Sequence, residues 1–592
     1  MNFLPQLRAQ FRPVLGSLAP DTAKLSDYLA MIKPAQNADL GDYQANMAMP
    51  LAKPLKRKPP EVAAEIIAKI PGNDLIESMT IAGPGFINIR LKDSALSLQA
   101  RAMAADSRLG VPLAASPLTY VVDYSGPNVA KPLHVGHLRS TIIGEALCRL
   151  LRFLGHSAIG DNHLGDWGTQ FGMLLYGYKN LLDAESFAAN PVNELARLYR
   201  KVRELAKAND DDEAERGNSV ADAYRAETVK LHAGDPGNVA LWQQFMPACM
   251  EEVDAIYRRL GVKFDHQHGE SFYNPMLPDV VAGLLEKNLA ERSEGAVIIR
   301  EGEDKVSLIQ KRDGAYTYTT TDLATIKYRV DTWQPHAMLY VVDFRQGDHF
   351  KNLFAAAKRW GYESVELTHV SFGSVLGEDG KPFQTRSGPT IGLHTLLDKA
   401  VELGLQKYEA SYQERLTRDE DLPVLGDAEK REIAEVVGIG AVKYADLSQN
   451  RTSDYRFSFD KMLATDGNTA TYMQYAYARC RSIFRKGEID VERFRASPPE
   501  VLIETPFERS LILQLLRWSE ALDVAAAEYM PHYLTSYLWD LSKAYSSFFV
   551  NCQVLKAESA ALRDSRLLLC DLTARVIQRT LHLLGIGTVE RM

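Results

Sequence analysis

The chain has 592 residues, more than a single hydrophobic core supports, so we expect several domains. Its formal charge of -8 gives no global basic surface, so a nucleic-acid partner would have to be held by local patches and by shape. The five cysteines form no CxxC pair and are odd in number, which argues against a disulfide framework and predicts no structural zinc. No stretch approaches the roughly 18 apolar residues of a membrane span, so we expect a soluble cytoplasmic protein.

Residues 1–112 mix helical patterns with two strand-like runs. These runs are Ser78–Ala82 and Phe86–Leu91, and Gly83-Pro84-Gly85 separates them as a turn signal. We predict a small α/β module for this region.

Residues 113–426 predict a Rossmann-like α/β domain. The run TYVVDY from Thr119 indicates a strand, His137–Leu154 has apolar residues at helical spacing, and a second strand lies around Ser157–Gly160. Such a β-α-β order is typical of a nucleotide-binding parallel sheet. The sheet resumes with strands at Leu339–Val342 and Thr368–Phe372, so residues 176–300 are interpreted as an insertion.

Residues 427–592 predict an all-α domain, because strand signals fade and long helical patterns dominate. These patterns cover Glu429–Leu447, Leu463–Arg485, Glu508–Ala527 and Leu562–Leu584.

The chemistry is concentrated in HVGH, His134 to His137, where a strand passes into a helix. Gly136 lets a nucleotide approach the backbone, the free N–H groups of a helix start favour anions, and imidazoles can donate to phosphate oxygens. An HxGH string alone is weak evidence, because histidine and glycine near a helix start usually only cap it.

Longer strings add context. SGPNVAKPLHVGHLRSTIIG begins at Ser125, NHLGDWGTQFG at Asn162 and TYTTTDLATIKYR at Thr317. Together with HVGH, which matches the HIGH signature, they resemble the arginyl members of the class I aminoacyl-tRNA synthetases. The resemblance implies arginine–tRNA ligase activity: ATP with Mg²⁺ activates L-arginine to arginyl-adenylate and pyrophosphate, and the 3′-terminal adenosine of tRNA(Arg) then accepts the arginyl group. Family members are usually monomers.

A guanidinium substrate needs carboxylates, which match its planar fork of donors. By the resemblance, the arginine-binding residues are Asp123, Gly126, Pro127, Asn128, His137, Tyr318, Asp322 and Gln346. The family more often has Ser or Ala at Gly126, and a backbone contact would survive that change. From the residues alone, Asp322 could instead cap a helix.

On the ATP side, the resemblance implies His134, Gly136, His137, Trp167, Gln170, Lys381 and Arg386, with His134, His137 and Lys131 catalytic. The KMSKS loop of class I enzymes is replaced by GKPFQTRSG, Gly380–Gly388, and Lys131 is the hypothetical substitute for its second lysine. A core role for Trp167 and a solvated loop at Lys381 are the alternatives.

The tRNA-binding candidates lie at both ends of the chain. The resemblance implies elbow contacts by Tyr43, Phe86 and Asn88 in an N-terminal elbow-binding module, and anticodon contacts by Tyr475, Arg479 and Arg481. Aromatic and basic side chains can stack on unpaired bases and pair with phosphates, although aromatics at this spacing are more often core.

Three other functions compete with this interpretation. HxGH also occurs in small nucleotidyltransferases, which normally lack a helical C-terminal domain. Another class I synthetase would be expected to show zinc-ligand cysteines, a true KMSKS or a large editing insertion. An inactive RNA-binding copy would typically have lost catalytic residues, whereas HVGH, Asn128, Tyr318, Asp322 and Gln346 are all present.

Overall fold

The computed structural model describes residues 2–35, 37, 40–210, 219–300, 306–377, 379–381, 392–417 and 425–590. They divide into two compact units. The central unit comprises Ala114–Ala464 and His582–Gly587, and the terminal unit comprises Met1–Leu113, Thr465–Leu581 and Thr588–Met592.

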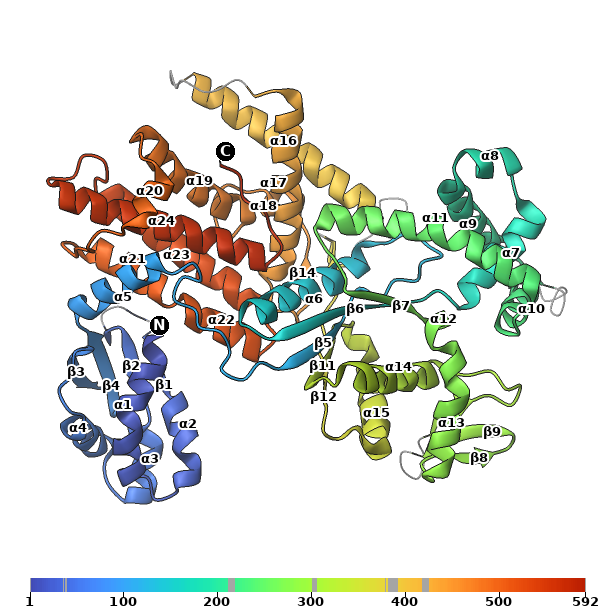
Figure 1. The fold of residues 1–592 in the computed structure, drawn as a ribbon, viewed down its shortest axis with the longest axis horizontal. Coiled ribbons are helices and arrows are strands. Elements are labelled where there is room, and N and C mark those ends of the chain that lie inside the picture. The colour runs from blue at the N-terminus through green and yellow to red at the C-terminus, as the bar shows by residue number, and fades with distance from the viewer. Residues whose placement is uncertain are drawn as a thin grey trace. The chain divides into compact units, whose positions relative to one another are not determined.

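The central unit is built on a five-stranded parallel sheet in the order β12-β11-β5-β6-β7 (Figure 1). The strands are β5 (Thr119–Asp123), β6 (Ser157–Leu164), β7 (His266–Gly269), β11 (Ala337–Tyr340) and β12 (Glu366–His369). The buried, largely apolar residues of the three central strands β11, β5 and β6 suit a sheet that helices cover. The expected Rossmann-like sheet is thereby confirmed.

The strand predictions hold with small shifts. β5 and β6 begin where the sequence indicates, whereas β11 begins two residues earlier than predicted. β7 comes from within residues 176–300 and pairs with β6, so part of the predicted insertion is an edge strand. Its sequence, HQHG, has no apolar alternation and therefore gave no strand signal.

The helices of the central unit flank this sheet and extend from it. They are α6 (Val135–Phe153), α7 (Thr169–Leu181), α8 (Ala184–Ala189), α9 (Pro191–Asp210), α10 (Val220–His232), α11 (Pro236–Leu260), α12 (Glu270–Tyr273), α13 (Leu277–Glu286), α14 (Tyr318–Trp333), α15 (Gly347–Ala357), α16 (Leu393–Leu416), α17 (Asp427–Leu447) and α18 (Phe459–Met462). Short 3-10 turns lie at Asn274–Met276 and Phe344–Gln346, and a π-helical turn at Lys358–Tyr362. A three-stranded antiparallel sheet contains β8 (Glu291–Ser293), β9 (Ala296–Arg300) and β10 (Val306–Gln310), and β13 (Val375–Leu376) pairs with β14 (Tyr455–Arg456).

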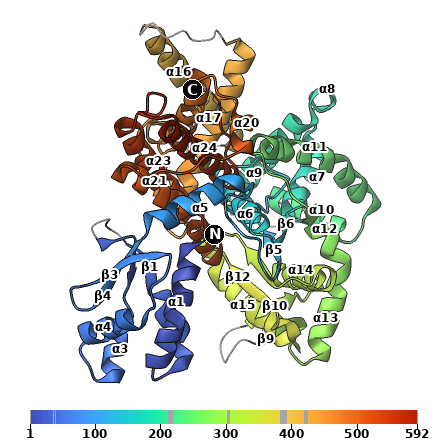
Figure 2. The same cartoon turned by 60° about the vertical axis from the view of Figure 1, so that its left-hand side comes forward.

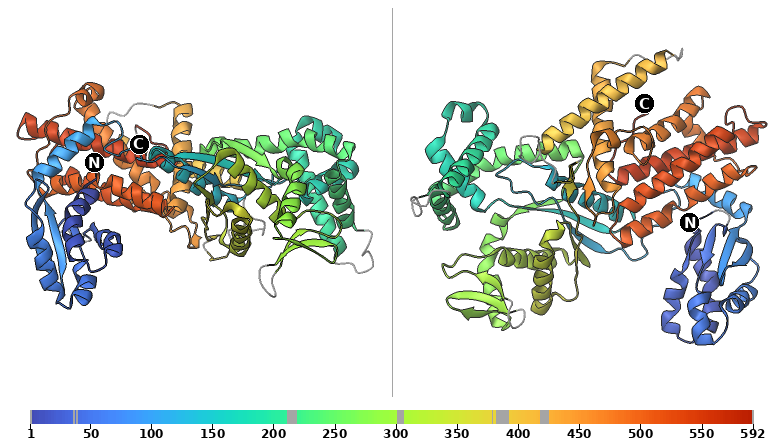
Figure 3. Two further views of the ribbon diagram at one scale, coloured as in Figure 1. Left: turned by 60° about the horizontal axis from the view of Figure 1, so that its bottom comes forward. Right: turned by 180° about the vertical axis from the view of Figure 1, so that it is seen from behind.

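Two close helix contacts shape the central unit. A Cβ added at Gly144 of α6 would lie 2.2 Å from the Tyr124 ring, so glycine lets α6 approach the end of β5. A Cβ at Gly438 of α17 would lie 2.6 Å from the Ala400 carbonyl oxygen of α16. The yellow and orange helices α16 and α17 accordingly lie side by side (Figure 3). α17, predicted to open the C-terminal helical domain, groups with the central unit.

The terminal unit combines both ends of the chain. Its antiparallel sheet has the order β1-β2-β4-β3, with β1 (Ile32–Pro34), β2 (Tyr43–Ala45), β3 (Ile76–Ala82) and β4 (Phe86–Leu91). The N-terminal helices are α1 (Phe3–Leu18), α2 (Leu25–Ala30), α3 (Ala48–Leu55), α4 (Pro59–Lys69) and α5 (Asp93–Ala105), with a 3-10 turn at Thr22–Lys24. The C-terminal helices are α19 (Ala470–Lys486), α20 (Val491–Ala496), α21 (Pro506–Leu516), α22 (Trp518–Ala527), α23 (His532–Asn551) and α24 (Ala560–Leu583).

Helix α5 packs against α20 and α21, which joins the N-terminal module to the C-terminal helices (Figure 2). Arg509 of α21 makes two hydrogen bonds of 2.8 Å to the buried carboxylate of Asp42. Such a bidentate pair fixes orientation as well as distance. Among the described helices of both units, none combines the length and apolarity needed to cross a bilayer.

Candidate active site

Three neighbouring strands place polar side chains in one row, at the carboxyl ends of β5 and β11 and in the second half of β6. Asp123 at the end of β5 is in register with Asp161 of β6 and with Tyr340 of β11. In open α/β sheets, ligands bind outside this edge. Arg329 of α14 lies over the row, with its Nη2 2.7 Å from Asp123 Oδ2 and its Nε 2.9 Å from Asp161 Oδ2. The predicted substrate ligand Asp123 therefore already contacts an arginine of the chain, which the sequence patterns did not indicate.

The loop after β5 is fixed to the segment that follows β6. The backbone N–H of Gly126 donates to Asn162 Oδ1 at 3.0 Å, and the Pro127 carbonyl accepts from Gly165 N–H at 2.9 Å. Gly126 has a φ of +53°, which glycine adopts without strain. Asn128 bridges to Gly165 and is half-buried. The structure thus brings Gly126, Pro127 and Asn128 to the sheet edge beyond Asp123.

The two histidines of HVGH form a capping box at the start of α6. His134 Nδ1 accepts from Gly136 N–H at 3.1 Å, and His137 Nδ1 accepts from the His134 backbone N–H at 3.1 Å. A Cβ at Gly136 would lie 2.9 Å from the His134 ring, so only glycine lets that ring fold over the helix start.

Burial favours the neutral form of both imidazoles. Desolvation, followed by the neighbouring charges of His134 and Lys131, lowers the pKa of His137 to about 3. Desolvation and Lys131 also lower the pKa of His134. A neutral imidazole whose Nδ1 accepts a hydrogen bond carries its proton on Nε2. The pair therefore presents two N–H donors beside a helix N-terminus, an arrangement suited to phosphate oxygens.

The cationic candidates differ in their surroundings. Lys131 is half-buried, and burial followed by the charge of Arg203 lowers its pKa. Its effect on the pKa of both HVGH histidines places its ammonium group within electrostatic range of them. Lys381 is exposed in a turn, where its backbone N–H donates to Asp379 Oδ1 at 3.0 Å. Arg386 lies outside the described residues.

The predicted guanidinium-binding residues of α14 lie in its first two turns. Tyr318 is 69% exposed, and Asp322 accepts a 2.7 Å hydrogen bond from Nε2 of His349 on α15. Gln346 is exposed one residue before α15 begins. Glu270 completes an acidic group: its burial, followed by the charges of Asp166 and Asp322, raises its pKa to about 7. His349 and Glu270 were missed by sequence reasoning, because a single histidine and a single glutamate form no motif.

Trp167 and Gln170, predicted on the nucleotide side, lie where β6 passes into α7. The Trp167 ring stacks on His232 with ring centroids 5.8 Å apart, and it meets Trp242 edge to face at 5.1 Å. Gln170 Oε1 would lie 2.8 Å from a Cβ at Gly168. Trp167 therefore packs against two aromatic side chains.

Comparisons with known proteins decide the family. The family described as "tRNA synthetases class I (R), catalytic domain" matches residues 101–459, "DALR anticodon binding domain" matches 473–592, and "Arginyl tRNA synthetase N terminal domain" matches 6–91. The chain belongs to the class I arginyl-tRNA synthetase family. The family expected from the sequence is confirmed.

Individual relatives match over nearly the whole chain. The "Arginine--tRNA ligase" of Rhodopirellula baltica is 44% identical, covering 99% of both chains. That of Escherichia coli K12 is also 44% identical, covering 96% of both chains. Among solved structures, an arginyl-tRNA synthetase from Plasmodium falciparum superposes with a TM-score of 0.81 and 28% identity, over 100% of this chain and 99% of its own.

The elbow candidates of this arginyl-tRNA synthetase family member lie in the terminal unit. Tyr43 is fully buried, and its hydroxyl donates to Glu520 Oε1 at 2.6 Å. Its ring is therefore part of the core and not accessible to tRNA, which corrects the prediction for this residue. Asn88 is half-buried and accepts from Gln44 Nε2 at 2.9 Å, and Phe86 is half-buried at the start of β4.

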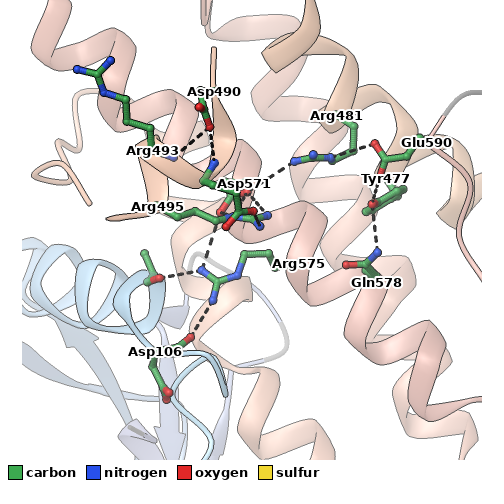
Figure 4. Close-up of polar contacts among 12 residues, drawn as sticks. Asp106, Tyr477, Arg481, Asp490, Arg493, Arg495, Asp571, Arg575, Gln578 and Glu590 are labelled. Carbon is green, nitrogen blue, oxygen red and sulfur yellow. Dashed lines mark hydrogen bonds and ion pairs between the residues drawn. The ribbon is translucent and has the colours of Figure 1, made fainter. Parts of the chain in front are cut away.

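The anticodon candidates lie on α19 in the same unit. Tyr475 is 41% exposed, and the Arg479 guanidinium lies over its ring at 4.6 Å and over Phe549 at 5.0 Å. Arg481 instead pairs with Glu590 at 3.2 Å and approaches Asp571 at 4.0 Å (Figure 4). Tyr475 and Arg479 form an accessible aromatic and cationic surface, whereas Arg481 is already engaged by carboxylates.

Proposed function

We propose that this chain activates L-arginine with ATP and transfers it to tRNA(Arg). In the first step the arginine carboxylate oxygen attacks the α-phosphorus of ATP, which enters as its magnesium complex. An O–P bond forms, and the bond to the leaving pyrophosphate breaks. In the second step a hydroxyl of the 3′-terminal adenosine of tRNA attacks the arginyl carbonyl carbon, and AMP leaves.

One observation carries this proposal. Neutral N–H donors lie at the start of one helix beside the sheet, and carboxylates lie at the sheet edge and near the start of another helix. His134 and His137 begin α6, and Asp322 lies in the second turn of α14. The donors suit phosphate, whereas the carboxylates suit a guanidinium. Neither step needs a protein nucleophile, so positioning and charge stabilisation supply the catalysis.

The phosphate side is assigned to His134 and His137 with the backbone around Gly136. Their Nε2 atoms donate to phosphate oxygens as charge develops there. Lys131 supplies the cation that a KMSKS lysine would supply, since its ammonium already acts on both imidazoles. Lys381 and Arg386 are also assigned to the ATP side.

The arginine side is assigned to Asp123 and Asp322 as carboxylates, with Tyr318 and Gln346 beside them. The backbone of Gly126 and Pro127, with Asn128, lies toward the amino-acid end of the substrate, as does His137. Gln170 contributes to nucleotide binding, and Trp167 supports the same segment by packing on His232.

The terminal unit holds tRNA in this proposal. Tyr475 and Arg479 take anticodon bases by stacking, because the exposed Tyr475 ring and the half-buried Arg479 side chain form one cation–π pair. Phe86 and Asn88 contact the elbow. We further propose that the enzyme acts as a cytoplasmic monomer, and light scattering after gel filtration tests its mass.

Amino-acid-dependent exchange between ATP and pyrophosphate tests the function. Purified protein is assayed with each of the twenty amino acids, with and without total tRNA. We expect exchange with arginine alone. Exchange that appears only with tRNA would add coupling between tRNA binding and activation. Folded protein that exchanges with no amino acid would favour the inactive RNA-binding alternative.

A further inference from the structure

Arg329 is fully buried and bridges the strands β5 and β6. Its guanidinium contacts Asp123 on one side and Asp161 on the other, and its Cζ lies 5.6 Å from the centre of the Tyr340 ring. Asp161 is 0% exposed, whereas the Asp123 side chain retains 13% exposure. Of the two carboxylates, only Asp123 is therefore open to a ligand.

The group formed by Asp123, Asp161 and Arg329 contains more negative than positive charges. Two carboxylates face one guanidinium, which stays protonated in proteins, so the group has a net charge of -1 when both acids are ionised. In register, Asp123 and Asp161 occupy adjacent strands, and without a cation between them two buried carboxylates would repel each other. Arg329 removes that repulsion and leaves one negative charge.

The hydrogen bonds are also directional. Arg329 engages the Oδ2 atom of each aspartate. The other oxygen of Asp161, Oδ1, is buried without a hydrogen-bond partner among the described residues, so it is closed to substrate. For Asp123, Oδ1 is the oxygen left for a second cation.

We propose that Arg329 is a positioning and specificity-determining residue for the substrate side chain. It holds Oδ2 of Asp123 inward and leaves Oδ1 to receive the guanidinium of arginine. Because Arg329 cancels the charge of Asp161, the group retains one negative charge, which a single cation of the substrate can neutralise. The inference rests on the proposed function, because it needs arginine as the substrate.

Helix α14 links this role to the second acid. Asp322 and Arg329 are seven residues apart on α14, which is two helical turns, so both lie on the same side of the helix. One helix thus contributes a carboxylate for the guanidinium and the side chain that orients the other carboxylate. Its placement fixes the distance between the two ligands.

The test uses a double variant of the full-length chain, Arg329→Gln with Asp161→Asn. It removes the cation and one carboxylate together, so the net charge of the group stays at -1 and no buried charge repulsion arises. Lys327→Gln is the matched control, because Lys327 lies on the same helix and pairs only with Asp331 at the surface among the described residues. The Michaelis constants for arginine and ATP and the turnover of exchange are measured for each.

We expect the double variant to raise the arginine KM about 10- to 100-fold, the scale of a hydrogen bond to a charged group. ATP KM should change less than about twofold and kcat less than about fivefold. Lys327→Gln should match the wild type. A purely structural role would lower the melting temperature and leave the arginine KM unchanged, and that result would overturn the inference.

Arg329→Lys decides the question if the double variant does not fold. It keeps the buried charge but loses the fork of donors that reaches both carboxylates. An arginine KM raised about fivefold or more supports the inference, and an unchanged KM overturns it. If the wild type itself shows no arginine-dependent exchange, the proposed function fails, and this inference fails with it. If the wild type is active and the variants keep its arginine KM, only this inference fails.

Discussion

His349 Nε2 donates a 2.7 Å hydrogen bond to Asp322 Oδ2, which joins α15 to α14 at a carboxylate that we propose binds the substrate guanidinium. This hydrogen bond, with the charge of Asp322, raises the pKa of His349. Asp322 thus has an internal partner before substrate binds, as Asp123 has Arg329.

The pair predicts a pH-dependent contribution to stability. Because the folded pKa of His349 is raised, its stabilisation is complete below the pKa of the unfolded state, near 6.5, and is lost as pH rises through the folded value. His349→Gln should lower the unfolding free energy by about 0.5–1 kcal/mol at pH 5.5, a value reduced for partial exposure, and by less at pH 8.5. Urea denaturation at both pH values measures this. His336→Gln, at an exposed site in the same unit, is the control, and an equal loss at both pH values contradicts the prediction.

Glu270 predicts a pH dependence of arginine binding. Burial and the charges of Asp166 and Asp322 raise its pKa to about 7. As pH rises through 7, Glu270 ionises and adds negative charge beside Asp322, so a guanidinium should bind several-fold more tightly at pH 8 than at pH 6. Titration calorimetry should show proton release on arginine binding near pH 7. Glu270→Gln should abolish this release, and its persistence in the variant would assign the proton to another group.

The HVGH histidines predict a loss of turnover when either is replaced, and for His137 this loss should not depend on pH. His137, with a pKa of about 3, is neutral throughout the assay range. His134→Gln and His137→Ala should each lower kcat for exchange about 10²- to 10³-fold, the scale of a lost oxyanion donor. For His137→Ala the loss should be equal at pH 6 and pH 8.5. A loss that appears only at acidic pH would mean that imidazolium is the active form.

Lys131 predicts a selective effect on the activation barrier. Lys131→Ala should raise the barrier to adenylate formation by about 2 to 4 kcal/mol, because charge on the phosphates loses its nearby cation. Arginine binding should change little. Single-turnover adenylate formation and equilibrium arginine binding separate the two effects. Equal losses in the rate of adenylate formation and in arginine affinity would mean that Lys131 is not a catalytic residue.

Tyr43 predicts a stability effect without an effect on tRNA. Its buried hydroxyl donates to Glu520, so Tyr43→Phe should lower the unfolding free energy by about 1–3 kcal/mol. The affinity for tRNA should match the wild type when measured by fluorescence titration below the melting temperature. Asn88→Ala, at a half-buried site in the same sheet, is the comparison. A large loss of tRNA affinity in folded Tyr43→Phe would restore the elbow contact.

Features that depend on neighbours along the chain could be predicted from the residues alone. The apolar spacing and the HVGH string placed a strand, a turn and a helix start in order, because the caps and periods involved are local. Tyr318 and Asp322 fall one turn apart on α14 for the same reason. The longer strings also identified the family.

Contacts between side chains far apart in the sequence became known from the fold. Arg329 reaches Asp123 across 206 positions and Asp161 across 168, and Tyr43 reaches Glu520 across 477. A pattern of burial shows that a side chain is inside but does not name its partner, since the partner depends on strand order and helix packing. The same holds for β7 and α17, whose weak or generic local patterns were assigned to a place only by pairing and packing.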